Sequence, residues 1–242
     1  MKHFPHLVYK DRSSLDFGLY IQTKGRYAGA ERDVTYTGVP GRSGDLITDN
    51  GRYKNLNIPY TMALLNTEAR PFGEIARAIS GWLLSEVGYF RLWDSYDENY
   101  FRLASYKGEV NIEQELETLG SLSLTFSCKP YQYSFQGQIP IPMTAPGVLY
   151  NPEAFPAAPY MKLTGEGDVT LYIGGNSLQI KEIDGFIELD FELPNAYKGM
   201  TPQNHKVSGA NLSGVRLLPG ENSISWAGNV ESLEIIPRWC CL

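Results

Sequence analysis

Apolar and polar side chains alternate in several short stretches of this chain. From Ser121 to Ser127 three apolar residues occupy every second position, and Leu15 to Ile21 alternates apolar with polar or small residues. A period of two places successive side chains on opposite faces of an extended strand. The pattern therefore predicts strands in both stretches, and a further short strand from Arg32 to Tyr36.

The segment from Val39 to Tyr60 is marked by turn-forming residues. Pro40-Gly41 and Asp49-Asn50-Gly51 are places where the backbone turns tightly or takes a positive φ, which glycine tolerates because it has no Cβ. We expect a β-meander with tight turns at these two positions, extending to about Leu65.

A single stretch, from about Pro71 to Glu86, has the period of an amphipathic helix. Its apolar residues recur at helical spacing and form one face: Phe72, Ile75, Ala76, Ile79, Trp82 and Leu83. Pro71 suits the first helical position, and Gly88 is placed to end the helix. Gly81 inside the helix suggests close packing against a sheet.

Two aromatic, β-rich runs follow, and they enclose the polar residues 94–99. This arrangement predicts a hairpin with an acidic turn. The pattern of residues 109–120 fits a strand or a helix equally well.

The pattern changes in the proline-rich stretch 136–160, which we interpret as a linker and the entry to a second domain. Beyond it, short strands are expected between turns at Gly174-Gly175-Asn176, Asp184-Gly185 and Ala227-Gly228-Asn229. The prediction is a mainly β protein with domains 1–136 and 137–242, each a β-sandwich, and one helix covering the first.

Composition supports a folded, β-rich chain. At 242 residues, 43% hydrophobic and 20% charged, the protein can bury a core without disulfides, and its 16 Tyr and 10 Phe favour strands. The net charge of -6 argues against a protein that grips duplex DNA through its phosphates, although acidic walls suit a channel that DNA passes through.

Cysteine usage and hydropathy indicate where the protein is made. Cys128, Cys240 and Cys241 form no disulfide framework and are expected as reduced thiols. The N-terminus lacks a signal-peptide core, and no apolar run approaches the ~20 residues of a membrane helix. We expect synthesis in a cytosol, without membrane insertion.

Catalytic and metal-binding patterns are weak. His3 and His6 have a spacing that could hold a metal, but solvated tail residues are the simpler interpretation, and no cofactor is expected. Gly165-Glu166-Gly167 is acidic and precedes a strand, so it predicts a turn rather than a phosphate cradle. Asp94 and Glu98 with nearby aromatics resemble the acid pair of a glycosidase, although an exposed acidic turn explains them as well.

Aromatic residues of the second domain suggest a binding alternative. Tyr160, Tyr172, Trp226 and Trp239 could form a stacking platform for sugar, or they could belong to a core or a subunit interface. A non-catalytic carbohydrate-binding module that recognises host cell-wall glycan is therefore the alternative function.

Taken in order along the chain, a set of phrases resembles the distal tail protein (Dit) family of long-tailed, siphovirus-type bacteriophages. They are SSLDFGLYI, PGRSGDL followed by GRYKN, FRLWDSYDENYFRLASY, LTFSCKPYQY, NPEAFPAAPYMKLTGEGDVTLYIGG, DGFIELDFE, LPGENSISW and EIIPRW. The resemblance spans nearly the whole chain.

The resemblance implies a structural, non-enzymatic protein of the virion tail tip. The N-terminal domain would be a tail-tube-like β-sandwich with one helix, and six copies would close into a ring whose lumen DNA traverses. The C-terminal domain would be a sandwich similar to galectins and carbohydrate-binding modules. The implied partners are the tail tube protein, a tail-associated protein and receptor-binding proteins, with assembly in the host bacterial cytoplasm. From turn position alone, Arg42, Asp45, Arg52 and Tyr53 are candidates for the ring interface or lumen loops.

Overall fold

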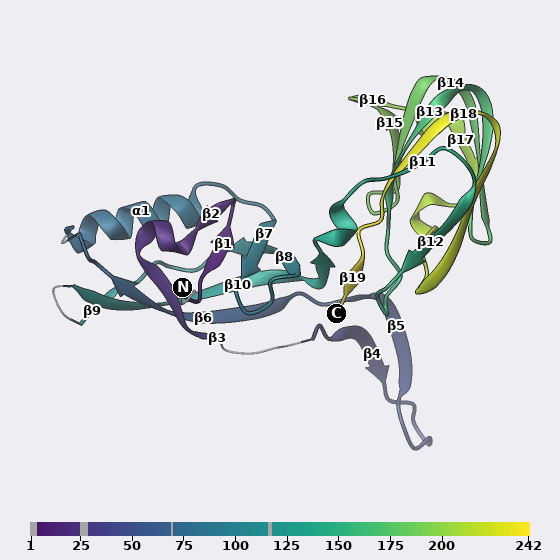
Figure 1. Ribbon diagram of the computed structural model, residues 1–242. Coiled ribbons are helices and arrows are strands. Elements are labelled where there is room, and N and C mark those ends of the chain that lie inside the picture. The colour runs from purple at the N-terminus through teal and green to yellow at the C-terminus, as the bar shows by residue number, and fades with distance from the viewer. Residues whose placement is uncertain (1–3, 25–28, 69, 116–117) are drawn as a thin grey trace. The chain divides into compact units, whose positions relative to one another are not determined.

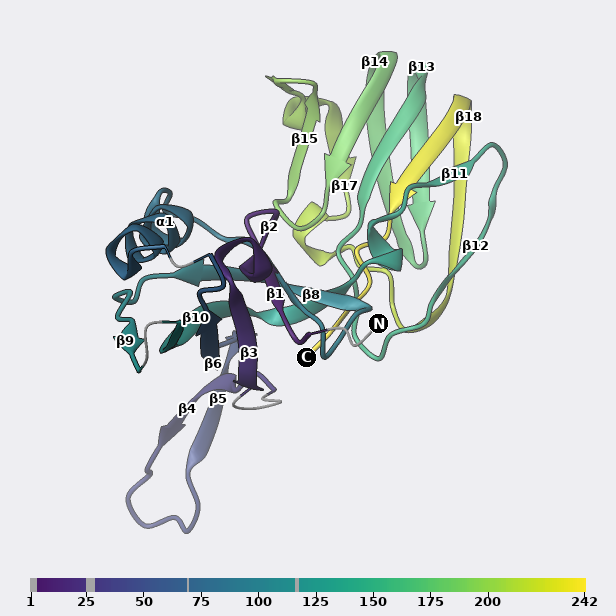
Figure 2. The same ribbon diagram turned by 60° about the vertical axis from the view of Figure 1, so that its left-hand side comes forward.

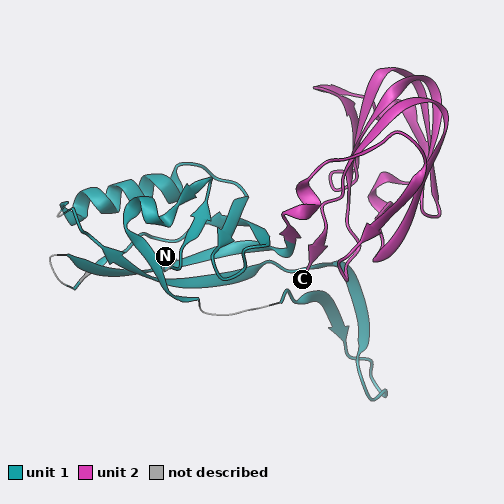
Figure 3. Cartoon of the chain, viewed as in Figure 1, with its two compact units in different colours: residues 1–132, 242 teal, residues 133–241 magenta. Residues whose placement is uncertain are grey.

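The chain folds into two units. The computed structural model describes residues 4–24, 29–68, 70–115 and 118–242. One unit comprises residues 1–132 with 242, and the other comprises residues 133–241 (Figure 3). The predicted boundary after residue 136 lies within a few residues of this division.

Unit 1 is built on one antiparallel sheet covered by a helix (Figure 1). The strand order is β2-β1-β7-β8-β10-β6-β3, and β9 also pairs with β10. The strands are β1 (Leu7–Tyr9), β2 (Arg12–Ser13), β3 (Leu19–Lys24), β6 (Leu56–Leu65), β7 (Phe90–Asp94), β8 (Tyr100–Tyr106), β9 (Glu113–Gln114) and β10 (Leu119–Ser134).

Alternation along the central strands produces the core of unit 1. β6 buries every second side chain from Leu56 to Leu64, and β10 buries Leu122, Leu124 and Phe126, as its period predicts. The predicted hairpin around residues 94–99 is confirmed by the antiparallel pairing of β7 with β8.

The strand predicted from Leu15 to Ile21 begins later, at Leu19, and two short strands, β1 and β2, precede it. Residues Ser14–Phe17 form a 3₁₀ turn because the Ser13 side chain accepts a hydrogen bond from the Leu15 amide while Asp16 accepts one from the Ser13 amide. Gly18 ends the turn at φ 70°, where a Cβ would lie 2.5 Å from the Leu65 carbonyl oxygen. Only then does β3 start.

The predicted helix is confirmed as α1 (Phe72–Leu84), and its apolar face packs on the sheet. The Trp82 indole N–H donates to the Tyr9 carbonyl at 2.8 Å, and its ring stacks on Phe17. Two details differ: Pro71 is the N-cap, and the helix ends before Gly88. Gly81 faces open space rather than a packed neighbour, so the expectation of close packing there was wrong.

A separate two-stranded ribbon, β4 (Arg32–Thr37) with β5 (Leu46–Tyr53), is inserted between β3 and β6 (Figure 1). The predicted Pro40-Gly41 turn lies in its connecting loop, where the Arg42 amide donates to the Val39 carbonyl at 3.1 Å. Asp49-Asn50-Gly51, predicted as a turn, lies within β5 instead. The register shifts there and Gly51 has φ 71°, so these residues form a bulge.

Unit 2 is a second antiparallel sheet built on three long strands, β13, β14 and β18 (Figure 2). The order is β11-β18-β13-β14-β15-β16, with β12 also on β18 and β17 on β14. The strands are β11 (Ile141–Met143), β12 (Gly147–Asn151), β13 (Tyr160–Ile173), β14 (Asn176–Asp190), β15 (Asn195–Lys198), β16 (Thr201–Pro202), β17 (Val207–Gly209) and β18 (Gly220–Ile236). The stretch predicted as a linker therefore contains two strands, β11 and β12. The last strand, β19 (Cys240–Cys241), pairs with β10 instead.

Three predicted turns of unit 2 lie inside these long strands. Gly165 pairs with Gly185, and Glu166 pairs with Asn229, so the glycine-rich positions of β13, β14 and β18 lie side by side. A Cβ on Gly165 would lie 2.2 Å from the Asn229 carbonyl oxygen. Glycine here permits close backbone approach and bulges rather than chain reversal. The predicted turn at Gly174-Gly175 is confirmed between β13 and β14.

The fold class is mainly β with one helix in the described part of the chain, as predicted. Side chains from both halves of the long strands are buried together, among them Leu163, Leu171, Ile187 and Leu233.

Candidate interaction surface

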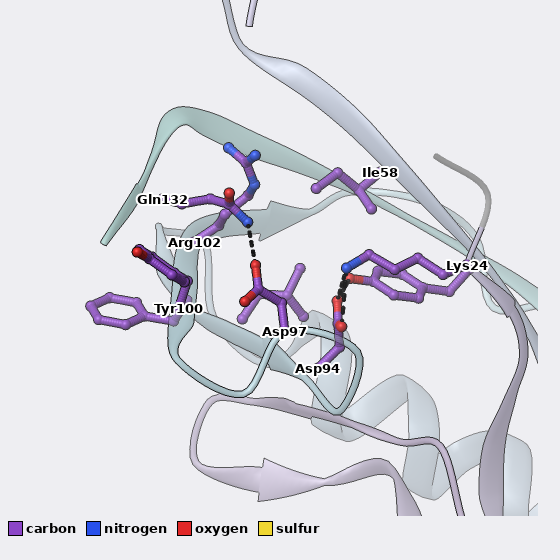
Figure 4. Close-up of a pocket in the computed structure, with 10 residues that line it drawn as sticks. Lys24, Ile58, Asp94, Asp97, Tyr100, Arg102 and Gln132 are labelled. Carbon is purple, nitrogen blue, oxygen red and sulfur yellow. Dashed lines mark hydrogen bonds and ion pairs between the residues drawn. The ribbon is translucent and has the colours of Figure 1, made fainter. Parts of the chain in front are cut away.

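A buried ion pair joins the ends of β3 and β7 in unit 1. Lys24, the last residue of β3, is in register with Tyr60 of β6. Lys24 reaches Asp94 at the end of β7, with Nζ 2.9 Å from Oδ2 (Figure 4). Both side chains are under one tenth exposed.

The Asp94 carboxylate is fully engaged inside the protein. It accepts hydrogen bonds from the Tyr60 hydroxyl at 2.6 Å and from the Tyr96 amide at 3.1 Å, in addition to Lys24. Burial and the Asp94 charge together raise the pKa of Tyr60 above its ordinary value, so this hydroxyl remains a donor. A buried charge is tolerated because every acceptor direction is occupied.

The small cavity beside this ion pair leaves no room for a substrate. It encloses about 20 Å³, enough for roughly one water molecule, and Asp97, Arg102 and Gln132 also line it (Figure 4). Gln132 donates to Asp97 at 3.3 Å, and Arg102 donates to the Pro130 carbonyl at 2.8 Å. These two hydrogen bonds join the turn between β7 and β8, and β8 itself, to β10.

Asp94 and Glu98 do not form the acid pair of a glycosidase. Asp94 is buried and paired with Lys24, whereas Glu98 is exposed on the turn and does not line the cavity. The interpretation as an exposed acidic turn therefore holds for Glu98 only. Asp94 is buried, and its carboxylate joins strands of the sheet.

Ion pairs join the two strands of the ribbon near its base. Arg32 pairs with Asp49, Arg52 Nε lies 2.6 Å from Asp33, and Lys54 Nζ lies 3.0 Å from Glu31. The hydrogen bond from Arg52 lowers the pKa of Asp33, and the hydrogen bond from Arg32 lowers the pKa of Asp49. Both carboxylates therefore remain charged well into the acid range.

Beyond its base the ribbon is exposed. Every residue from Thr35 to Arg52 is exposed, including large apolar side chains. Tyr36 is 62% and Ile47 61% exposed, and the two are in register on one face. An isolated two-stranded ribbon is marginally stable in water, and exposed apolar side chains at its end indicate a surface that binds a partner.

All four residues predicted for an interface lie on this ribbon. Arg42 and Asp45 are exposed in the connecting loop. Arg52 and Tyr53 are at the base, where Arg52 pairs with Asp33 and the half-buried Tyr53 packs against Tyr131 at 6.0 Å between ring centroids. The prediction omitted Tyr36 and Ile47, although their place in a β-rich run between turn residues could have pointed to them.

The four aromatic residues proposed for sugar stacking do not form one platform. Trp239 is 5% exposed, and Trp226 is in register with the buried Leu171, on the opposite face of the sheet from Tyr172. The Tyr160 hydroxyl donates to Glu188 at 2.5 Å. Tyr172, 41% exposed, is the one of the four with a freely accessible ring.

The described residues contain neither a metal site nor a helix that could cross a membrane. His3 lies outside them, and His6 contacts Trp93 edge to face. No group of three or more His, Cys, Asp or Glu side chains there could hold a metal ion. Nor is any described helix long and apolar enough to cross a membrane.

Comparison with solved structures finds similar folds among the distal tail and baseplate proteins of phages. One match is SPP1 Dit, described as a paradigm of the hub adsorption apparatus in phages that infect Gram-positive bacteria. Its TM-score is 0.73 at 10% identity, with 96% of this chain and 98% of that chain covered.

Two further matches are chains of the phage P2 baseplate in its activated conformation, with Ca and with Sr. Their TM-scores are 0.52 and 0.50 at 8% identity, with 96% of this chain and 97% and 98% of those chains covered. No model of a known protein family and no curated protein sequence matches. At these identities the likeness shows a Dit-like fold over 96% of the chain, as the resemblance implied.

Proposed function

We propose that this protein is the distal tail protein of a long-tailed phage of the siphovirus type, and that it forms a hexameric ring at the tail tip. The observation that carries the proposal is the likeness to SPP1 Dit, which includes both units and nearly the full length of both chains. Under this proposal the protein is a structural hub without enzymatic activity.

The β4–β5 ribbon supports self-association. Among the described residues its two strands pair only with each other, so each strand keeps one open edge. A ring requires a heterologous contact in which one surface of a subunit fits a different surface of the next, and closure covers exposed strand edges. We assign this contact to the ribbon, with Arg42 and Asp45 at the subunit contact or the lumen and Arg52 and Tyr53 holding its base.

The remaining roles follow from a ring at this position. The ring would join the tail tube protein on one side to a tail-associated protein on the other and carry receptor-binding proteins. DNA would pass through the lumen without specific binding, which agrees with the net charge of -6. Assembly would take place in the cytoplasm of the host bacterium.

Negative-stain electron microscopy and light scattering of the purified protein test the ring. We expect six-fold particles with an open centre. The double variant Tyr36→Asp, Ile47→Asp should remain monomeric, because it places charges on the apolar end of the ribbon and removes contacts of the kind worth about 2 kcal/mol or more in an interface.

Leu193→Asp is the matched control, since Leu193 is 72% exposed but lies in unit 2. It should assemble as the unmodified protein does, with an unchanged circular dichroism spectrum. Monomers of the unmodified protein at every concentration would contradict the ring, and rings that survive the double substitution would contradict the role of the ribbon.

A further inference from the structure

Tyr172 lies among uncharged side chains on one face of the sheet in unit 2. In β13 it is in register with Ser225 of β18 and with Ser177 of β14, and residues in register project from the same face. The other neighbours on this face follow from the same register and are also small or uncharged: Thr170, Gln179, Ser223 and Ala227. We call these seven residues the Tyr172 face.

The tyrosine ring is accessible because its neighbours are short. Tyr172 is 41% exposed, whereas the residues before and after it in β13, Leu171 and Ile173, are buried in the core. At one border of the face, β12 adds Val148 and Tyr150, which are 62% and 65% exposed. Val148 is in register with Ser223, so the apolar border is continuous with the Tyr172 face.

The polar groups of the Tyr172 face are available for a ligand. The side chains of Thr170, Ser177, Gln179, Ser223 and Ser225 form no hydrogen bond with other described residues, and they offer both donors and acceptors. Elsewhere on the same long strands the polar groups satisfy one another. There Tyr160 donates to Glu188, and the Lys162 ammonium lies 4.7 Å from the Phe186 ring centroid.

We propose that the Tyr172 face binds a neutral saccharide. A pyranose ring has an apolar C–H face that packs on an aromatic ring and a rim of hydroxyls that exchange hydrogen bonds with hydroxyl and amide groups. The seven residues of the face include no Arg or Lys, and the charges nearest along its strands are Lys181 and Glu221, one of each sign, beyond Gln179 and Ser223. Phosphorylated or acidic polymers are therefore disfavoured, because no cluster of cations pairs with their charges. The surface is a flat sheet face rather than a pocket, so a single site binds weakly, at about 1 mM. Binding at this face does not depend on ring formation.

Isothermal titration calorimetry of the full chain tests this proposal. The probes are oligosaccharides of glucose, galactose, rhamnose and N-acetylglucosamine, with oligogalacturonate and glycerol phosphate oligomers as anionic comparators. We expect saturable binding of at least one neutral probe and about tenfold weaker binding in Tyr172→Ala, as expected when an aromatic stacking contact is lost. Ser225→Asp, which adds a charge beside the ring, should weaken binding similarly.

Two control variants separate ring stacking from general effects. Tyr172→Phe keeps the ring, and Tyr96→Ala removes a tyrosine of similar exposure, 43% against 41%, from unit 1, so both should bind within about twofold of the unmodified protein. Circular dichroism confirms that each variant is folded. The proposal is overturned if no neutral probe binds, if only the anionic probes bind, or if Tyr172→Ala binds as well as the unmodified protein.

Discussion

A charged residue that is paired in the core contributes more to the stability of the protein than one that is paired on the ribbon. Asp94 is buried, and its partners Lys24 and Tyr60 lie on two other strands. The ribbon pairs, such as Arg52 with Asp33, have at least one exposed partner and contribute little, since water screens them. Removing one partner of a buried pair is costly because the other charge remains without compensation.

Asp94→Ala should therefore lower the free energy of unfolding by about 3 kcal/mol or more. Asp45→Ala, in the exposed loop of the ribbon, is the control and should change it by less than about 0.5 kcal/mol. Urea denaturation followed by fluorescence measures both. Equal effects of the two substitutions would show that the buried pair does not stabilise unit 1.

At the scale of elements, glycines have opposite roles in the helix and in the long strands. Gly81 of α1 faces open space, whereas Gly165 of β13 lies against the backbone of β18. Gly81→Ala should stabilise the protein by about 0.5–1 kcal/mol through helix propensity. Gly165→Ala should destabilise it by about 2 kcal/mol or more, because the methyl group would overlap the Asn229 carbonyl oxygen. Thermal unfolding of the two variants gives the comparison, and a stable Gly165→Ala protein would refute the close approach of the strands.

The elements that the sequence predicts well are those with a local period. The face of α1 and the alternation of β10 need only neighbours within a few positions. Glycine and asparagine signals are less specific, because the residues that suit a turn also suit a bulge: Asp49-Asn50-Gly51 and Asp184-Gly185 lie inside strands. The Lys24–Asp94 pair joins residues 70 positions apart, so no local pattern reveals it. The Tyr172 face likewise depends on the register of three strands.

At the scale of the whole molecule, both units carry carboxylates with lowered pKa values. In unit 2, burial opposes ionisation of Asp190, but bidentate hydrogen bonds from Arg238 at 2.8 and 2.9 Å lower its pKa below the ordinary value. A carboxyl with a lower pKa in the folded state stabilises the protein at pH values above its unfolded pKa of about 3.9 and loses this contribution as the pH falls.

Stability should thus be constant near neutral pH and decline below about pH 4. Asp190→Asn should be less stable at neutral pH and show a smaller decline in acid, since its side chain cannot titrate. Thermal unfolding between neutral pH and pH 3 measures both, with Asp184→Asn as the control because Asp184 is 91% exposed. The role of Asp190 would be refuted by equal acid sensitivity of Asp190→Asn and the unmodified protein.

In the proposed ring, the stability of the β4–β5 ribbon would also depend on the concentration of the protein. Its strands have hydrogen bonds to each other but no core of their own, so in an isolated subunit their amides are protected only by a marginally stable pairing. In the proposed ring, each ribbon would gain partners from the next subunit, and its opening would require dissociation. Hydrogen exchange at Thr35 to Arg52 would then slow as the protein is concentrated, while exchange in the core of β6 would not change. The hydrogen-exchange rate of the ribbon amides would thus measure assembly of the ring.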